Sequence, residues 1–179
     1  MFLVGGVACV GPESGVESDL SRESPVRSEP ERIPLLEPYA LIPVEADADP
    51  LGDHRPSAVD CPAATWGPEG GGFEIQTGVC NYAAFDQPVP VPIIAGDSLN
   101  ILLWHDTLDF AEPAMAHVAV WIDETVVWQT EVAIPGPSNA FEVTVPIVEA
   151  PTPNARLGLH LHNHGYNSWR FVALDLLRR

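Results

Sequence analysis

From residue 59 to the C-terminus, the apolar residues of this chain come in short runs, each bounded by Pro, Gly, Asp or Asn. No window in this region repeats its apolar residues with the 3.6-residue period of a helix. Residues 73–80 (FEIQTGVC) instead alternate apolar with polar side chains, which is typical of a half-buried strand. This pattern restricts the folded part of the chain to β-strands joined by turns.

Several segments have the length and the apolar pattern of strands: residues 73–80, 98–105, 115–122, 125–134, 140–147, 156–162 and 169–177. Only Asp123 and Glu124 separate the third segment from the fourth, which predicts a hairpin. Residues 98–105 are largely apolar on both faces, as in a central strand. Because the connections are too short for crossover helices, we predict an all-β fold, an antiparallel two-sheet β-sandwich of the jelly-roll type.

Residues 10–58 have a different composition, dominated by Ser, Glu and Pro, and their apolar residues follow no period. Such a sequence buries too little apolar surface to fold, and its prolines exclude a long helix. We therefore expect a flexible linker, part of a disordered N-terminal tail, before a folded domain at residues 59–179. The apolar cluster at residues 33–44 either docks against this domain or forms a short polyproline-like stretch.

The first nine residues, MFLVGGVAC, form an apolar run that ends at Cys9. They resemble the end of a bacterial lipoprotein signal, in which the cysteine is lipidated and becomes the first mature residue. Gly6 stands where a Leu-like residue is usual and no positive charge precedes the run, so either the true start lies upstream or this is an ordinary terminus. The resemblance implies lipidation at Cys9, a place in the bacterial cell envelope (outer-membrane lipoprotein, periplasmic or extracellular), and membrane contact through that anchor alone.

Cys61 and Cys80 are the two remaining cysteines. In an oxidising compartment we expect them to form a disulfide around the glycine-rich residues 62–79, which contributes about 3 kcal/mol in the chain-entropy model. The alternative is a pair of buried free thiols.

The chain has 8 basic residues, all of them Arg, against 25 Asp and Glu residues, and its formal net charge is −17. A field of this sign repels a phosphate backbone, so we expect no nucleic-acid partner. The sequence has no serine-nucleophile elbow, phosphate-binding loop, zinc-protease helix or dinucleotide fingerprint. We therefore expect a non-catalytic protein, and a copper oxygenase with histidine ligands is the enzymatic alternative.

Three of the six histidines fall within residues 160–164. If this segment is extended, three leucines face the core and three histidines face the other way: Leu157, Leu159 and Leu161, and His160, His162 and His164. Residues two apart on a strand are separated by about 7 Å, close enough for His160 and His162 to share a zinc or copper ion. His105 and His117 would complete such a site, unless they are hydrogen-bonded core histidines, whereas His54 lies in the predicted linker.

The stretch NHGYNS at residues 163–168 is rich in residues that tolerate left-handed backbone conformations and cap backbone groups. It predicts a tight corner between the last two strands, built on Asn163, Gly165 and Asn167 and clamped by Tyr166 and Trp169. The nearby histidines would then be structural or form a polar surface, which is the alternative to a metal site.

Carboxylates are frequent in the loop HDTLDFAEP at residues 105–113. Asp106, Asp109 and Glu112 either bind calcium or are simply solvated.

The order of the elements resembles the galactose-binding-like jelly roll of many carbohydrate-binding modules. The segments that carry the resemblance are AGDSLNILLWH at 95–105, VAVWIDETVVWQ at 118–129, AFEVTVPI at 140–147 and HNHGYNSWRFVALDL at 162–176. The resemblance implies a non-catalytic domain whose loops bind a glycan or a cell-surface protein, often with a structural calcium ion. The candidate ligand-binding residues are His164, Tyr166, Asn167, Asp106 and Asp109. The five tryptophans all fit core positions, so the sequence identifies no exposed aromatic platform.

Overall fold

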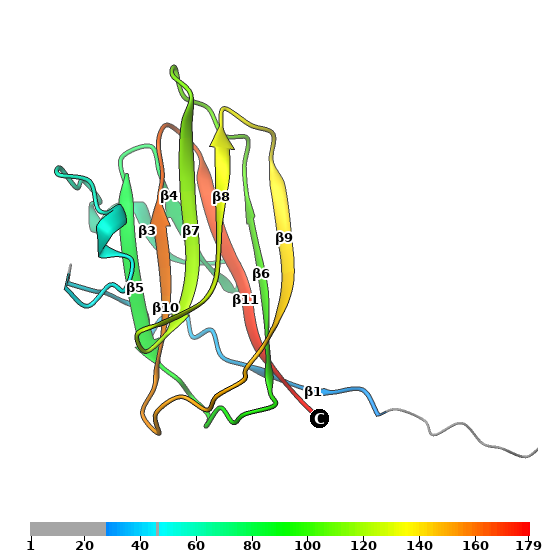
Figure 1. Cartoon of the computed structure of the whole chain (residues 1–179). Helices are drawn as coiled ribbons and strands as arrows, with labels where there is room; N and C mark the ends of the chain where they lie inside the picture. The colour runs from blue at the N-terminus through cyan, green and yellow to red at the C-terminus, as the bar shows by residue number, and fades with distance from the viewer. Residues whose placement is uncertain (1–27, 46) are drawn as a thin grey trace, which may run out of the picture.

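The computed structural model describes residues 28–45 and 47–179. Over this range the chain folds into two antiparallel sheets packed face to face, which confirms the predicted all-β sandwich (Figure 1). Cys9 lies outside the described residues, so its lipidation stays a prediction. No helix in the described part is long and apolar enough to cross a membrane.

Each sheet has a continuous order of neighbouring strands. Sheet A runs β3 (Trp66–Glu69), β4 (Gly72–Gln76), β11 (Ser168–Arg178), β6 (Ser98–His105) and β9 (Asn139–Pro146), and β1 (Glu31–Pro34) pairs with β11. Sheet B runs β2 (Ile42–Pro43), β5 (Tyr82–Pro88), β10 (Arg156–His162), β7 (Ala114–Ile122) and β8 (Thr125–Ile134). Two 3₁₀ helices, Gly52–His54 and Ala63–Thr65, precede β3.

The core lies between the two sheets and follows the alternation of side chains along the strands. Leu157, Leu159 and Leu161 of β10 point inward and are buried, as the sequence predicts. They belong to one cluster with Leu103 of β6 and Phe171 of β11, on the facing sheet. Each such side chain contributes about 1.5–3 kcal/mol when it leaves water, so the alternation fixes which face of β10 is outward.

All of the predicted strands are present, and β6, β8 and β10 have the predicted bounds. The two-residue hairpin is confirmed as well, with Asp123 at a φ of 53°, the left-handed conformation that such turns require. Pairing of β6 with both β11 and β9 confirms it as a central strand. The sequence did not reveal β5, because residues 82–87 are buried on both faces and therefore do not alternate.

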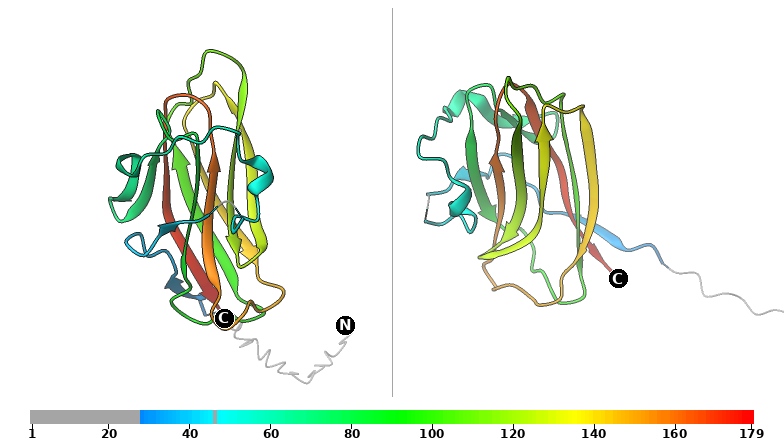
Figure 2. Two further views of the ribbon diagram at one scale, coloured as in Figure 1. Left: turned by 90° about the vertical axis from the view of Figure 1, so that its left-hand side faces the viewer. Right: turned by 45° about the horizontal axis from the view of Figure 1, so that its top comes forward.

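The predicted domain boundary at residue 59 is wrong, because described residues before it belong to the sandwich. β1 pairs with β11 and β2 pairs with β5, so this part is not a flexible linker. Leu35 and Leu41 are buried in the core, and the Leu35 amide donates to the carbonyl of Leu174 (2.7 Å). Of the two alternatives for residues 33–44, docking against the domain is correct. Figure 2 shows this N-terminal segment, blue to cyan, running from beside the C-terminal end of β11 to the β5 side of the molecule.

Candidate functional site

The corner between β10 and β11 forms around Trp169, as predicted. The indole N–H of this buried residue donates to Asn163 Oδ1 and to Asn167 Oδ1, each at 3.1 Å. Asn163 is also buried, and its amide donates to the carbonyl of His164 (2.9 Å). Buried polar groups with satisfied partners make a local structure rigid. Tyr166 does not clamp the corner, because its side chain is 78% exposed.

Gly165 allows the corner to touch the loop between β6 and β7. Its φ is 80°, and a Cβ at this position would overlap the carbonyl oxygen of Asp109. The backbone N–H of Tyr166 donates to that same oxygen (3.2 Å), and the two residues form a short β-bridge. The corner therefore places Asp109 and the adjoining Phe110 beside Tyr166.

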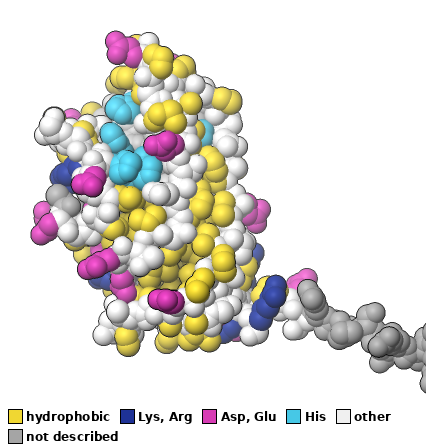
Figure 3. Space-filling view, in the orientation of Figure 1, with side chains coloured by type: hydrophobic (Ala, Val, Ile, Leu, Met, Phe, Trp, Pro, Cys, Tyr) yellow, Lys and Arg dark blue, Asp and Glu magenta, His cyan; other side chains and the backbone are white. Residues whose placement is uncertain are grey.

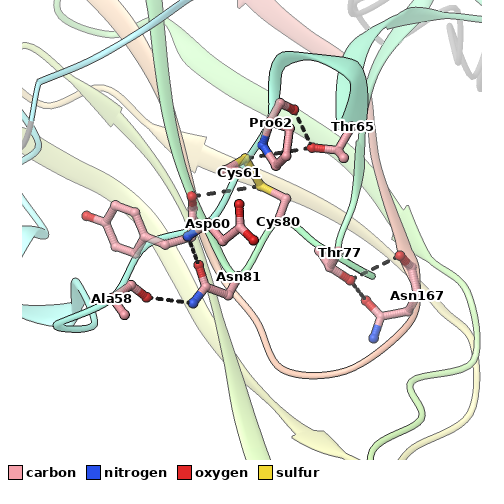
Figure 4. Close-up of a disulfide and its surroundings, with 10 residues drawn as sticks. Ala58, Asp60, Cys61, Pro62, Thr65, Thr77, Cys80, Asn81 and Asn167 are labelled. Atoms are coloured by element: carbon pink, nitrogen blue, oxygen red, sulfur yellow. Dashed lines mark hydrogen bonds between the residues drawn. A yellow bond between two sulfur atoms is a disulfide. The ribbon is translucent and has the colours of Figure 1, made fainter.

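A disulfide between Cys61 and Cys80 braces the opposite side of the same end of the sandwich, which confirms the predicted pair (Figure 4). Next to it, the side-chain oxygen of Asn81 accepts a hydrogen bond from the backbone N–H of Asp60 (3.0 Å). The backbone oxygen of Asn81 accepts from the N–H of Asn163 (2.9 Å). The disulfide thus holds the segment before β3 and the segment before β5 together, and both against the corner.

These segments enclose an open pocket at the loop end of the sandwich. Three exposed apolar side chains line it, those of Val79 (52% exposed), Phe110 (40%) and Tyr166 (78%). The Tyr166 ring lies against Gly78, where a Cβ would come within 2.7 Å of two ring atoms. The polar side chains of the pocket are Asp60, Thr77, Asn81, Asp109, Asn163 and His164. An aromatic surface and hydrogen-bonding groups therefore share one rigid frame.

Three of the five predicted ligand residues, Asp109, His164 and Tyr166, meet in this pocket. The other two do not line it. Asn167 holds the corner instead, and Asp106 is exposed elsewhere, with its backbone N–H bonded to the carbonyl at position 168 (3.0 Å).

Phe110 and Val79 are pocket residues that sequence reasoning missed. Phe110 could have been predicted as a binding residue, because it is an apolar residue inside an acidic loop. Val79 alternates with Phe73 and Ile75, and the sequence therefore placed it in the core; the structure ends β4 at Gln76, so Val79 is free to face solvent.

The four histidines predicted as metal ligands do not form one set. His105, on β6, points into the core, with its ring 4.4 Å from that of Trp169 and its Nδ1 2.7 Å from the Asp106 carbonyl. His117 on β7 and His160 on β10 lie on the outer face of sheet B, because they alternate along their strands with core residues. The core alternative is therefore correct for His105 but not for His117.

Residues 47–57, which we call the strap, lie at the β5 edge of sheet B (Figure 1) and contact its outer face at His117 and His160. Asp49 of the strap accepts hydrogen bonds from His160 Nδ1 (2.9 Å) and from the Tyr82 hydroxyl. Burial opposes ionisation of Asp49, but these two donors outweigh it and lower the pKa of the carboxyl. Burial and the same carboxylate raise the pKa of Tyr82. Asp49 is thus a buried anion held by a phenol hydroxyl and an imidazole N–H.

A second strap residue, His54, stacks on His117 with ring centroids 4.0 Å apart and planes 12° from parallel. Arg55 lies over the ring of Tyr82 at 5.1 Å. Nothing in the sequence around His54 indicates this contact, because its neighbours have the composition of a linker. Histidine side chains consequently gather on one part of the face shown in Figure 3.

The stacked arrangement does not suit a shared metal ion, because stacked imidazoles carry their nitrogen lone pairs in parallel planes. Throughout residues 28–45 and 47–179, no group of three or more His, Cys, Asp or Glu side chains is placed to hold a metal ion. The zinc or copper set predicted from His105, His117, His160 and His162 is therefore not found there, and neither is the predicted calcium loop.

Burial makes two of the outer-face histidines hard to protonate. Desolvation, together with the nearby rings of His164 and His160, lowers the pKa of His162 to about 4. Desolvation, with His54 and His160 as neighbours, also lowers the pKa of His117. Both rings are consequently neutral at pH 7.

Comparison with known proteins gives structural likeness only. No protein-family model matches the chain, and no curated protein matches it. The chain can be superposed on a CBM4 structure (TM-score 0.43, 12% identity, covering 83% of this chain and 95% of the other). BiXyn10A CBM1 gives a TM-score of 0.46 at 10% identity, with 84% and 99% covered. The C-terminal CBM6 of LamC, a marine laminarinase from Zobellia galactanivorans, gives 0.40 at 14% identity, with 83% and 98% covered. These structures are of the class that the sequence pattern resembles, but likeness at this level transfers no ligand.

Proposed function

We propose that this protein is a non-catalytic glycan-binding domain whose site is the pocket between the β10–β11 corner and the disulfide. The observation that carries the proposal is the exposed aromatic patch of Tyr166 and Phe110 beside the side chains of Asp109, Asn81 and His164. A sugar ring presents an apolar C–H face and a belt of hydroxyl groups. Aromatic rings pack against the first, and carboxylate, amide and imidazole groups bond to the second.

The rigidity of the frame supports the same function. A loop that is already ordered loses little conformational entropy when a ligand binds, so a weakly interacting ligand such as a sugar is retained. Gly165, the Trp169 hydrogen bonds and the disulfide all hold the pocket segments in place. The exposed Tyr166 ring thus rests on a fixed base.

The charges of the pocket favour neutral glycans. Its lining includes the carboxylates of Asp60 and Asp109 and no Arg or Lys side chain. The formal net charge of the chain, −17, adds a repulsive field for anions. We therefore expect polysaccharides that carry uronate or sulfate groups to bind more weakly than neutral ones of similar length.

Attachment to the cell envelope is part of the proposal. Lipidation of Cys9 would tether the domain to a membrane through the residues before β1. Mass spectrometry of protein purified from its own envelope tests this, since a diacylated or triacylated Cys9 supports the tether and an unmodified Cys9 contradicts it.

Affinity electrophoresis in gels that contain neutral or anionic polysaccharides tests the binding proposal. We expect retardation in at least one neutral glycan, and about tenfold weaker binding for Tyr166→Ala, because central aromatic anchors commonly contribute more than 1 kcal/mol. Tyr39→Ala is the matched control, since Tyr39 is 93% exposed and lies outside the pocket. Equal retardation of both variants, or none for the wild type on any glycan, would contradict the proposal.

A further inference from the structure

The strap is fixed to sheet B differently at its ends and in its middle. Before it, β2 pairs with β5, and after it comes the disulfide between Cys61 and Cys80. None of the backbone hydrogen bonds described for residues 47–57 reaches a strand of sheet B; they are local, as from His54 N–H to Leu51 O (2.9 Å). The middle of the strap is therefore attached to the sheet by side chains, so it can lift while both ends stay in place.

Several buried polar atoms beneath the strap lack hydrogen-bond partners. Three buried side-chain atoms of sheet B have no partner there: His117 Nδ1, His160 Nε2 and Trp121 Nε1. Trp121 shares a hollow with Asp47 and Pro50 of the strap. A buried polar atom without a partner has lost its hydration without compensation. Contact with water after opening would restore that hydration, which reduces the cost of lifting the strap.

The side chains that hold the strap carry titratable groups. His54 stacks on His117, and His160 bonds to Asp49. Other titratable or charged groups face this cluster from the elements around it: Arg55 of the strap, Tyr82 of β5, Glu131 of β8, His162 of β10 and His164 of the corner.

We propose that the strap is an acid-released cover, in which protonation of the stacked imidazoles lifts residues 47–57 from β7 and β10 while the ends of the segment remain attached. A proton on the buried His117 ring places a charge in a desolvated contact, and a second proton on His54 would place like charges on rings whose centroids are 4.0 Å apart. Both effects disappear when the strap leaves the sheet.

The direction of the effect follows from the competing charges. Asp49 and Glu131 stabilise nearby imidazolium groups and so oppose release, whereas burial and the neighbouring rings act the other way. For His117, burial and the neighbouring rings of His54 and His160 outweigh the acceptors and lower its pKa in the closed state. The open state therefore binds protons more tightly, and acid favours it. Release uncovers Tyr82, Trp121 and His160, a surface separate from the loop-end pocket.

Hydrogen–deuterium exchange of the full chain at pH 7.5 and pH 5.0, corrected for intrinsic exchange rates, tests the proposal. We expect exchange in residues 49–57 to accelerate several-fold at the lower pH, because the open state takes up a proton more readily than the closed state. Exchange in β6 should stay unchanged. Equal protection of the strap at both pH values overturns the proposal, and so does a loss that includes β6, which would be general acid unfolding.

Matched substitutions at one position separate titration from packing. His117→Phe keeps a ring against His54 without a titratable nitrogen at the buried position, so the strap should stay protected at pH 5.0. His117→Ala removes both and should raise exchange at both pH values. Asp49→Asn weakens the bond to His160 and should open the strap at pH 7.5. Wild-type acid release in His117→Phe, or unchanged protection in Asp49→Asn, overturns the proposal.

Discussion

The two regions that flank β10, the corner and the strap contact, differ in whether a buried tryptophan has a hydrogen-bond partner. Trp169 in the corner donates its indole N–H to two asparagine oxygens, whereas Trp121 beneath the strap has no partner for its own. Both side chains are almost completely buried. In the corner, internal hydrogen bonds satisfy the indole nitrogen, and the side-chain nitrogen of Asn167 is the buried atom without a partner, whereas three ring nitrogens lack one beneath the strap. We therefore expect the corner to be the more rigid of the two regions.

The difference arises from how the two segments reach the sandwich. The corner is a short connection between two consecutive strands, one in each sheet, so the packing of sheet A on sheet B brings its residues together at little entropic cost. The strap comes from a region far from β7 and β10 in the sequence, and individual side chains hold it. A fixed frame suits a ligand pocket, and a weakly held cover suits a response to conditions.

Removal of the disulfide is expected to have the largest effect, because it belongs to both regions. Cys61→Ala with Cys80→Ala should lower the free energy of unfolding by about 3 kcal/mol, measured by urea denaturation. Because the bridge also anchors the end of the strap, exchange in residues 49–57 should rise already at pH 7.5. A loss of stability without any change in the strap would show that the disulfide does not anchor it.

Replacing each tryptophan by phenylalanine compares the two regions directly. Trp169→Phe should cost about 2–3 kcal/mol, because it leaves the buried Asn163 Oδ1 without its donor, removes one of the two donors to Asn167 Oδ1 and creates a small cavity. Trp121→Phe should cost at least about 1 kcal/mol less, since no hydrogen bond is lost there. Urea denaturation of both variants measures the difference, and equal costs would mean that the corner bonds add little.

The sequence predicted the corner and the sandwich well because both depend on local patterns. Alternation placed Leu157 and His160 on opposite faces, and Asn and Gly marked the turn. The same patterns did not predict the strap or β5. Contacts with distant segments position the strap, and β5 does not alternate because it is buried on both faces. His54 was assigned to a linker because nothing near it shows that His117 lies beneath. Phe110 and Tyr166 met in one pocket only through the Gly165 contact with Asp109, which no spacing in the sequence reveals.

Acid should weaken the outer-face region before it affects the corner, and His162 gives the smallest but most specific measure of this. Its pKa is about 4 in the folded chain, against about 6.5 for an unfolded histidine. Above pH 6.5 both states are neutral and nothing is lost. As the pH falls from there to about 4, the unfolded state takes up the proton first, so stability declines, and below that range the difference is constant.

The decline attributable to His162 should be about 1–2 kcal/mol, less than the full shift implies because solvent screens a half-buried ring. Urea denaturation of the wild type and of His162→Gln across this range measures it, and the variant should show a correspondingly flatter curve. The corner has its own test, because Trp169 is bonded by amide groups that do not titrate. Hydrogen exchange in residues 163–169 should therefore stay unchanged down to pH 5, and a urea stability curve for His162→Gln identical to the wild type would place the acid sensitivity elsewhere.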